Sequence, residues 1–326
     1  MRRPSAATTY TVISVLLFPV SLLGYAIWIG FGLLPGRKRS GVSFTAQSPL
    51  AARWAMHLMG TRRDEPADRL IPLVPGLPPV ARRLVSAPAL LAHRVTGHVP
   101  KAFAYPFEGD VPKEYEAAAR VTFFDQALER CLPEIEQFVI LGAGFDTRPY
   151  RLSPGTPVRS FEVDEPRTQA VKRAMLAQAA IDTSAVAFVV ADFETEDWLA
   201  RLVATGFDAA KRTFFLWEGV VMYLDRAAVQ DTLRKIAGTA PGSVVAFDYF
   251  TSEALTSTAP YWRMARVSTR AAGEPIKFGI DSTPPSRERL AEFLASCGLT
   301  LREQRTLGQE TKEERAWGGF AVAGVA

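Results

Sequence analysis

The stretch Phe138-Val-Ile-Leu-Gly-Ala-Gly-Phe-Asp-Thr-Arg-Pro-Tyr-Arg151 decides the fold of this 326-residue chain. Its first four residues are a continuous apolar run, which is typical of a strand buried on both faces. Gly142 and Gly144 flank Ala143, so the backbone can turn tightly and a ligand can come close to the main chain. This pattern indicates a nucleotide-binding loop. A plain turn can have the same spacing of glycines. The third glycine of the dinucleotide fingerprint is also missing, and the segment that begins at Asp146 takes its place.

A carboxylate stands at the distance that a nucleotide site requires. Residues 158–163 form a second strand-like run, and Asp164 follows it about 20 residues after the glycines, where this fold holds ribose hydroxyls. A carboxylate accepts hydrogen bonds from two neighbouring hydroxyls. Glu162 shares the face of Asp164 but lies farther from the end of the strand, so we expect Asp164 to be the ribose ligand.

Four short motifs follow one another along the chain from residue 141. They are Leu141-Gly-Ala-Gly-Phe-Asp-Thr-Arg148, Phe161-Glu-Val-Asp-Glu-Pro166, Ala191-Asp-Phe193 and Trp217-Glu-Gly-Val-Val-Met-Tyr-Leu224. Together they resemble the leucine carboxyl methyltransferase family, which includes bacterial O-methyltransferases acting on small molecules and uses S-adenosylmethionine. The resemblance covers Tyr115 to the C-terminus and implies the Rossmann-like fold of class I methyltransferases. It does not indicate the methyl acceptor.

Four further residues complete the expected cofactor site. Arg120 matches an arginine that contacts the carboxylate end of the cofactor in the family, and a guanidinium offers a carboxylate a planar fork of donors. Asp192 and Phe193 end the third strand-like run, where they can bind and stack on adenine, and Glu218 matches a family glutamate that contacts the cofactor. The alternatives are a solvated charge for Arg120 and a cap for either acid. The expected cofactor-binding residues are Arg120, Gly142, Ala143, Gly144, Asp164, Asp192, Phe193 and Glu218.

Strand and helix patterns alternate through residues 115–326, the expected methyltransferase domain. Seven strand-like runs are present, the last three at 243–250, 299–304 and 317–325. The last two fit the antiparallel closing pair that the methyltransferase fold adds to a Rossmann sheet. We therefore expect an α/β fold with a mostly parallel seven-stranded sheet and a closing antiparallel strand. Residues 251–282 depart from the alternation and are expected to pack over the acceptor site.

Residues 10–34 contain no charged side chain. These 25 residues are enough to cross a bilayer as one tilted helix, with a kink expected at Pro19. The stretch is too long for the core of a signal peptide and no small-x-small cleavage site follows it; a buried core helix is the other alternative. We therefore expect a transmembrane anchor with a basic flank over residues 1–42.

The cations that follow this segment predict its orientation. The cations that follow the segment, Arg37 to Arg39 and Arg53, outnumber the two arginines that precede it. Because cytoplasmic flanks carry the excess of Lys and Arg, we expect the next domain on the cytoplasmic side of the cell membrane, where S-adenosylmethionine is made. Residues 43–114 are expected to form a helical cap or linker. Their arginines suit anionic lipid head groups, but we favour a cap over the active site.

The composition limits the other partners. The formal charge is +4 with a pI of about 9.1, and the cationic excess precedes residue 105, which favours a membrane surface over nucleic acid. Cys131 and Cys297 are too few and too far apart for a disulfide framework. His93 and His98 have no acidic or cysteine partner at ligand spacing, so no metal site is expected.

The expected reaction transfers a methyl group to an oxygen. The cofactor carries the reactivity, while the protein holds the acceptor in line and desolvates it. All three histidines precede the matched region, so no histidine-acid pair is recognisable there; this favours a carboxylate or acidic hydroxyl of a small-molecule, lipid-like or protein C-terminal acceptor. Arg148, Tyr223 and Tyr261 are the catalytic candidates expected to hold that group, with Arg151 beside them. Salt bridges are the alternative for the two arginines.

Two other functions fit the same loop. An NAD-dependent oxidoreductase shares the strand-glycine-helix start, but the missing third glycine and the motif around Glu218 argue against it. A membrane-tethered binding protein can retain this fold without turnover. Asp164, Asp192 and Glu218 each stand where a working cofactor site needs an acid, which argues against a protein without turnover.

Overall fold

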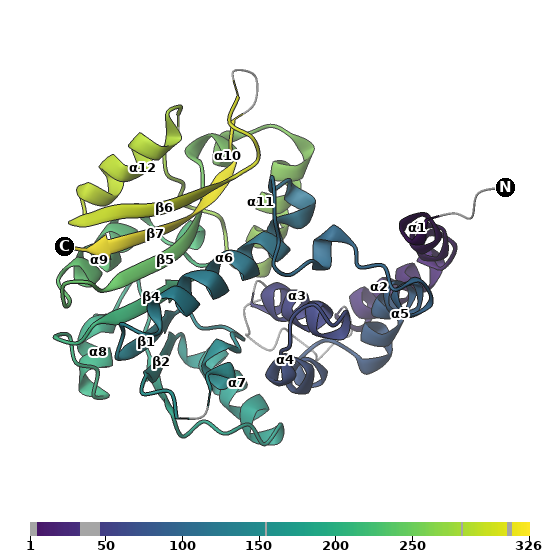
Figure 1. Ribbon diagram of the computed structural model, residues 1–326, viewed down its shortest axis with the longest axis horizontal. Coiled ribbons are helices and arrows are strands. Elements are labelled where there is room, and N and C mark those ends of the chain that lie inside the picture. The colour runs from purple at the N-terminus through teal and green to yellow at the C-terminus, as the bar shows by residue number, and fades with distance from the viewer. Residues whose placement is uncertain (1–4, 33–45, 154, 282, 312–314) are drawn as a thin grey trace.

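A seven-stranded sheet forms the centre of the molecule (Figure 1). The computed structural model describes residues 5–32, 46–153, 155–281, 283–311 and 315–326. Its strands are β1 (Gln137–Leu141), β2 (Arg159–Asp164), β3 (Val186–Val190), β4 (Thr213–Trp217), β5 (Val244–Phe250), β6 (Leu299–Leu307) and β7 (Gly318–Val325). The order is β3-β2-β1-β4-β5-β7-β6, and β7 runs antiparallel to both of its neighbours while the other pairs are parallel. The expected mostly parallel sheet with a closing antiparallel strand is confirmed.

Alternate side chains of each central strand pack on opposite faces of the sheet. In β1, Val139 and Leu141 belong to one hydrophobic cluster, and Phe138 and Ile140 belong to another. This alternation is the two-residue period of a strand. Burial on both faces explains why β1 reads as an unbroken apolar run in the sequence.

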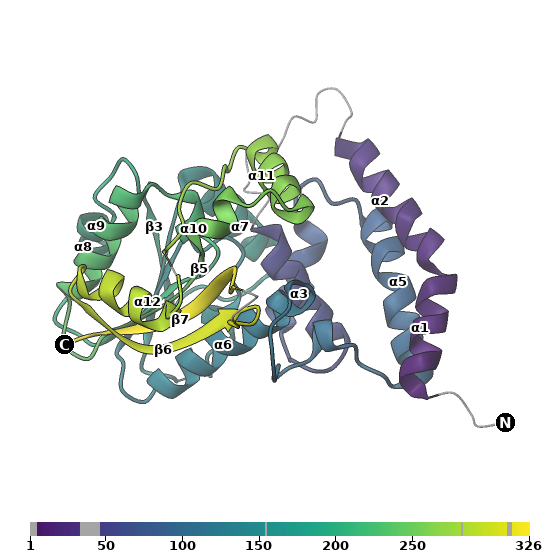
Figure 2. The same ribbon diagram turned by 90° about the horizontal axis from the view of Figure 1, so that it is seen from above.

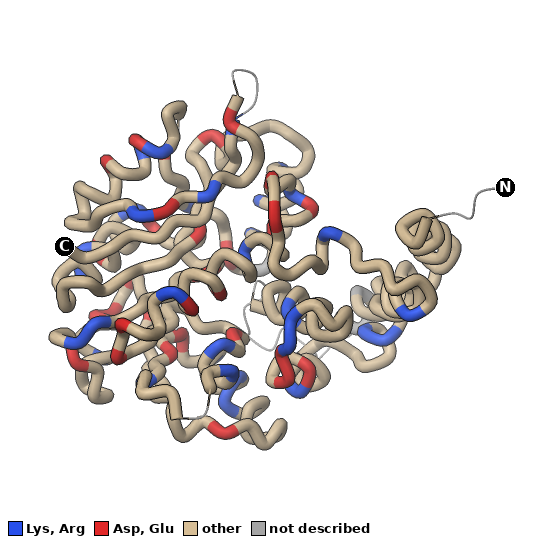
Figure 3. Tube along the Cα trace, viewed as in Figure 1, with Lys and Arg blue, Asp and Glu red and all other residues tan. Residues whose placement is uncertain are grey.

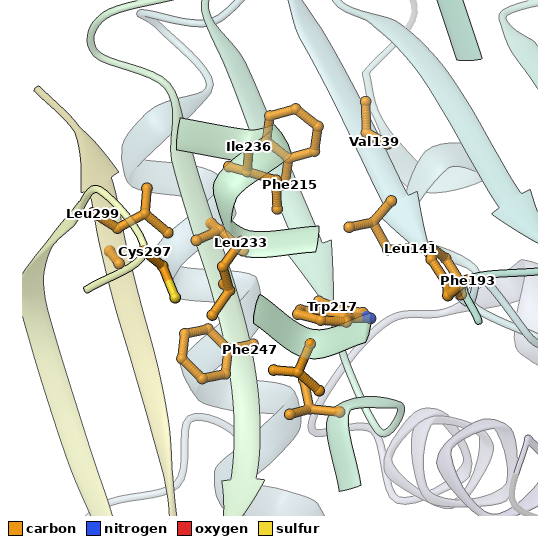
Figure 4. Packing of buried hydrophobic residues seen from close by; sticks show 14 of the residues in the cluster. Val139, Leu141, Phe193, Phe215, Trp217, Leu233, Ile236, Phe247, Cys297 and Leu299 are labelled. Carbon is orange, nitrogen blue, oxygen red and sulfur yellow. The ribbon is translucent and has the colours of Figure 1, made fainter. Parts of the chain in front are cut away.

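Helices cover both faces of the sheet. The first cluster is completed by α8 (Trp198–Ala204), α9 (Arg226–Ala237) and α12 (Ser286–Ala295). Figure 4 shows strand residues Phe215 and Phe247 gathered with Leu233 and Ile236 of α9 in this cluster. On the other face α6 (Glu116–Cys131) packs with aromatic residues of the strands. The result is a three-layer α/β domain, in which strand ends rather than strand faces are left for a site.

The strand order reverses between β1 and β4. These two strands pair in parallel at the middle of the sheet, with Val139 opposite Phe215. From this point the chain continues outward in opposite directions, to β2 on one side and β5 on the other. Such a switch point leaves a crevice outside the carboxyl ends of the strands. The glycine loop follows β1 and Glu218 follows β4, so both lie at this crevice.

A helical cap lies against the glycine-loop end of the sheet. It contains α3 (Gln47–Leu58) and α4 (Glu65–Leu70), which pack with Phe145 and with α7 (Pro166–Gln178) in a third hydrophobic cluster. Helices in this region were expected from the sequence, whereas the division of the chain at residues 42 and 114 stays a prediction. Residues 33–45, which include the cations Arg37 to Arg39, lie outside the described residues.

Three helices of the N-terminal region form a layer apart from the sheet (Figure 2). In this N-terminal layer, α1 (Ala6–Leu16) and α2 (Phe18–Gly32) pack against α5 (Pro79–Thr96). A Cβ atom on Gly24 would lie 2.8 Å from the backbone nitrogen of Val85, so a glycine is needed for α2 to approach α5 this closely. The Ser21 hydroxyl also donates to the Val85 carbonyl oxygen at 3.1 Å.

The expected membrane helix is divided into two in the structure. The break lies at Leu17, and the axes of α1 and α2 are bent by 48°. Pro19, where a kink was expected, takes the second position of α2, in the first turn, where its missing N–H costs no hydrogen bond. Among the described residues no single helix is long and apolar enough to cross a membrane, and α1 with α2 meets that test only as a bent pair. A straight single span is therefore not supported.

Residues 251–282 interrupt the alternation of strands and helices, as expected. They contain α10 (Ser252–Thr256) and α11 (Pro260–Ala272), and Gly273 ends α11 with a φ of +88°. The chain then returns to the sheet, where Ile280 bridges to Thr251.

Candidate functional site

A cavity of about 300 Å³ lies at the carboxyl ends of the parallel strands. Its wall is built by the loops after β1, β2, β3 and β4, together with residues from α3, α6 and the segment after α11. The structure brings all the expected cofactor residues and Tyr223 to this one wall: Arg120, Gly142, Ala143, Gly144, Asp164, Asp192, Phe193, Glu218 and Tyr223. Residues more than 100 positions apart therefore meet at the switch point of the sheet.

The two glycines of the loop are required by close contacts and by their backbone. Gly142 has a φ of +67°, and a Cβ there would lie 2.4 Å from a methyl group of Val220. Gly144 has a φ of +44°, and its Cβ would come within 3.1 Å of the Cβ of Ala46 in the cap. The Gly142 and Ala143 N–H groups donate to the Val163 carbonyl oxygen at 2.8 and 3.1 Å. The loop is thus fixed between β2, β4 and the cap, with its backbone facing the cavity.

Asp164 is buried at the end of β2, where the sequence predicts a ribose ligand. Its carboxylate accepts from the N–H groups of Gly144 at 2.6 Å and Glu165 at 2.7 Å. Burial nevertheless raises the pKa of Asp164 to about 7. Glu162, two positions earlier, is instead held by Lys172 at 2.7 Å and by the Tyr150 hydroxyl at 2.8 Å, away from the cavity wall. The geometry thus agrees with the choice of Asp164 over Glu162.

Asp192 and Phe193 lie where the chain leaves β3. The Asp192 carboxylate accepts from the Glu194 N–H at 2.8 Å, so it caps the turn as well as lining the cavity. Phe193 packs against Trp198 and Trp217, with ring centroids 6.1 and 6.5 Å apart. A fixed ring and a partly exposed carboxylate side by side suit an aromatic base with an exocyclic amino group.

Arg120 is tied to two carboxylates at the base of the cavity. Its guanidinium pairs with Glu116 on the preceding turn of α6 and with Asp248 of β5, the latter at 3.2 Å. Asp248 also accepts from the Gly219 N–H at 2.6 Å, and burial raises its pKa to about 6. The buried Nε of Arg120 has no partner among the described residues. The solvated-charge alternative for Arg120 does not fit this position.

Glu218 belongs to a buried network of arginines and acids. Arg148 Nη1 donates to its carboxylate at 2.6 Å, and Arg53 Nη2 donates to it at 3.2 Å. Asp146 accepts from Arg53 at 3.1 Å and also pairs with Arg148. Burial acts to raise the pKa values of both acids, but the two arginines outweigh it, lowering that of Asp146 to about 2 and that of Glu218 below its ordinary value. Both acids are therefore ionised at neutral pH.

Two of the three catalytic candidates lie outside the cavity wall. Arg148 is 2% exposed and pairs with Asp125 at 2.7 Å as well as with Asp146 and Glu218, which matches the salt-bridge alternative rather than an acceptor contact. Tyr261 of α11 is 47% exposed, and the Lys113 ammonium lies 4.5 Å from its ring centroid. Arg151 is also absent from the wall. Only Tyr223, of the three candidates, lines the cavity.

Arg53 is a site residue that sequence reasoning missed. The sequence pattern placed it among the cations flanking a membrane segment, whereas the structure buries it to 2% exposure in the cavity wall. Its Nε is buried without a partner among the described residues. A usable signal was present, because Leu50 and Met56, three positions before and after Arg53, are apolar and buried. A lone arginine on the buried stripe of a helix needs an anionic partner.

The chain is similar in sequence to known methyltransferases. Residues 79–237 match the family model of leucine carboxyl methyltransferases. A relative from Mycolicibacterium smegmatis, provisionally named an S-adenosyl-L-methionine-dependent methyltransferase, is 35% identical over 176 residues, which are 53% of each chain. One from Mycobacterium marinum with the same name is 33% identical over 205 residues, which are 60% of this chain and 65% of that one.

The matched segments span about half to two thirds of the length of these relatives. A solved structure of a DUF574 family protein from Streptomyces avermitilis covers 85% of this chain and 97% of its own, with 16% identity and a TM-score of 0.48. The family match includes the glycine loop and the motif around Glu218, both of which line the cavity. Residues 79–237 thus share the sequence pattern of the leucine carboxyl methyltransferase family, and the cofactor of the related proteins is S-adenosylmethionine.

Proposed function

We propose that this protein transfers the methyl group of S-adenosylmethionine to an oxygen of an acidic acceptor. The observation that carries the proposal is that one cavity, at the β1/β4 switch point, gathers every residue expected to bind the cofactor. Its volume of about 300 Å³ lies at the lower end of the range for small-molecule sites. The cofactor supplies a methyl group on a sulfonium ion, and the protein supplies binding, orientation and exclusion of water.

The described residues fit this cofactor in three places. Asp164 offers carboxylate oxygens for a ribose, and its raised pKa indicates that its charge lacks a full set of donors. Gly142 and Gly144 leave the backbone open where a side chain would obstruct the approach of a ligand. Arg120 has an unsatisfied buried Nε that suits the carboxylate of an amino acid.

An acceptor that is already an anion is favoured by the residue types of the described cavity wall rather than by its charge, because its acids outnumber its cations. Arg53, Arg120 and Lys277 are the cations of its wall, and no histidine or cysteine lines the wall among the described residues. Without such a base, a carboxylate or an acidic hydroxyl is the simplest oxygen nucleophile. We propose that Arg53 and Tyr223 face this group on a small-molecule, lipid-like or protein C-terminal acceptor. Arg148, bound to three acids, then positions Glu218.

We also propose that the chain is attached to the cell membrane, with its cavity on the cytoplasmic side. The uncharged residues 10–34 and the excess of cations that follows them support this placement.

Calorimetric titration of S-adenosylmethionine, its demethylated product and NAD into the full chain tests the cofactor assignment. We expect saturable binding of the first two, weakened at least about tenfold in Asp164→Asn because an amide is a poorer acceptor for paired hydroxyls. Asp182→Asn, which changes an exposed acid remote from the cavity wall, is the matched control. Binding of NAD alone would support an oxidoreductase. Cofactor binding without methylation of any acidic acceptor would support a non-catalytic binding protein.

A further inference from the structure

The N-terminal layer contributes nothing to the core of the sheet domain. The three hydrophobic clusters of the described residues contain no side chain from α1, α2 or α5. These helices instead pack against one another: Gly24 of α2 lies against the backbone of α5 at Ala81, and the ring centroid of Tyr10 on α1 lies 5.3 Å from that of His98, just after α5. Figure 2 shows the layer standing beside the sheet domain, with one broad side facing away from it.

The N-terminal layer exposes many large apolar side chains. Of the 15 large hydrophobic side chains exposed among the described residues, ten belong to α1, α2 and α5. The most exposed are Leu16 at 72% and Val15 at 66% on α1, and Leu23 at 55% on α2. The others are Val12, Phe18, Leu22, Tyr25, Val80, Leu91 and Val95. Large apolar side chains gathered on three helices that pack together mark a binding surface in a stable protein.

The charges of the layer have one sign. Residues 5–32 carry no charge, and α5 carries Arg82, Arg83 and Arg94 but no acid. Figure 3 accordingly shows basic but no acidic residues on this layer. Arg82 lies over the Trp54 ring of α3, with 5.4 Å to its centroid, whereas Arg83 and Arg94 are exposed. Apolar side chains next to exposed cations are the pattern of helices that lie in the surface of an anionic bilayer.

We infer that α1, α2 and α5 together form a plate that lies in the surface of an anionic lipid bilayer, with the apolar side chains inserted and Arg83 and Arg94 at the head groups. The 48° bend and the packing of α1 and α2 along α5 suit helices lying flat side by side. A second copy of the chain is a poorer occupant of the surface, because it would bring the exposed arginines of two layers together.

The plate is also connected to the candidate site. Arg82 of α5 stacks on Trp54, the neighbour of Arg53 in α3, and Arg53 lines the cavity wall. Bilayer binding would therefore hold the cavity near the head groups. Resting on the function proposed above, this position gives the cavity access to acidic acceptors dissolved in the membrane.

Sedimentation of the full chain with lipid vesicles tests the plate independently of methyl transfer. We expect the protein to sediment with vesicles of phosphatidylcholine and phosphatidylglycerol and to bind vesicles of phosphatidylcholine alone more weakly. The triple variant V15Q/L16Q/L23Q should lose at least about tenfold in partition coefficient. The variant R83E/R94E should lose about fivefold for each arginine, and this loss should diminish in high salt.

Val203→Gln is the matched control, since Val203 is 47% exposed on α8 at the far end of the molecule (Figure 1). It should bind vesicles as the wild type does. Titration of S-adenosylmethionine into each variant reports folding and the cofactor site separately, so a failed cofactor assignment leaves the vesicle result interpretable.

Three results would overturn the inference. The first is equal vesicle binding by V15Q/L16Q/L23Q and the wild type. The second is a wild type that dimerises through this surface and ignores vesicles. The third is protein that resists extraction from membranes by alkaline carbonate, which would indicate a spanning segment rather than a surface plate. Extraction of the protein by carbonate, together with the expected losses of vesicle binding in the two variants, would support the inference.

Discussion

The protonation of Asp164 should make ligand binding at the candidate site depend on pH. Its pKa of about 7 means that the folded protein retains a proton that the unfolded chain, with an ordinary value near 4, has already lost. Its contribution to stability is thus fully present below about pH 4 and is lost as the pH rises through about 7. In the proposed contact with a ribose, the hydroxyls favour the ionised carboxylate, so we expect ligand binding at lower pH to release this proton.

The affinity for S-adenosylmethionine should therefore rise between about pH 6 and about pH 8, by up to about tenfold. Asp164→Asn should weaken binding and flatten this dependence, because the amide does not titrate. Calorimetry in two buffers of different ionisation enthalpy would count the protons released. A wild-type affinity independent of pH would show that Asp164 does not ionise on binding.

Gly142 combines a left-handed backbone with a close contact. We expect Gly142→Ala to lower the free energy of unfolding by about 2 to 4 kcal/mol, because its Cβ would lie 2.4 Å from Val220. Gly76→Ala is the matched control, since Gly76 has a φ of +80° but open space around it, and it should cost only about 1 kcal/mol. Denaturant unfolding measures both. Equal losses would leave only backbone strain as the reason for a glycine at residue 142.

The element that links the cap to the sheet is α3, through Arg53. Removing this guanidinium leaves Glu218 and Asp146 with Arg148 as their shared partner. Arg53→Met should therefore cost about 3 kcal/mol or more in unfolding free energy, as buried pairs do when one partner is lost. It should also raise the pKa of Glu218. Arg63→Met, which breaks an exposed pair with Glu65 in the same cap, should cost less than about 1 kcal/mol. Similar losses in the two variants would mean that the buried network is not cooperative.

Some elements were readable from sequence because one local cause determines them. β1, β4 and β5 are apolar runs because both of their faces are buried. Asp164, Asp192 and Glu218 could be placed at the cavity because each lies at or just after the carboxyl end of a parallel strand, and such ends meet at one edge.

Other residues depend on partners that no local pattern reveals. Arg53 and Arg148 meet Glu218 across 165 and 70 positions of chain, so the identity of their partner follows from tertiary structure alone. Tyr261 was expected over the acceptor because its segment interrupts the fold, but the turn of α11 directs it to Lys113. Residues 10–34 satisfy the length of a membrane span, yet composition does not reveal the bend at Leu17 or the packing on α5.

At the scale of the whole molecule, the sheet domain has large clusters of buried apolar side chains, to which the N-terminal layer does not belong. We expect hydrogen exchange at the amides of α1 and α2 to be at least about a hundredfold faster than at those of β1 and β4, because helices outside the main core open at lower cost. Anionic vesicles should slow exchange in α1, α2 and α5 but not in α8. Uniform exchange throughout the chain would show that the layer and the sheet unfold as one unit.

The reversed direction of β7 places the last described residue far from the chemistry. Gly324 pairs with Val244 at the beginning of β5, so the chain reaches Ala326 at the edge of the sheet where the parallel strands start, opposite the cavity. Figure 1 shows that end on the other side of the molecule from α1. A fluorophore or an immobilising peptide attached after Ala326 would leave the cavity and the N-terminal layer equally accessible. Cofactor binding and vesicle binding can therefore be followed on one immobilised sample.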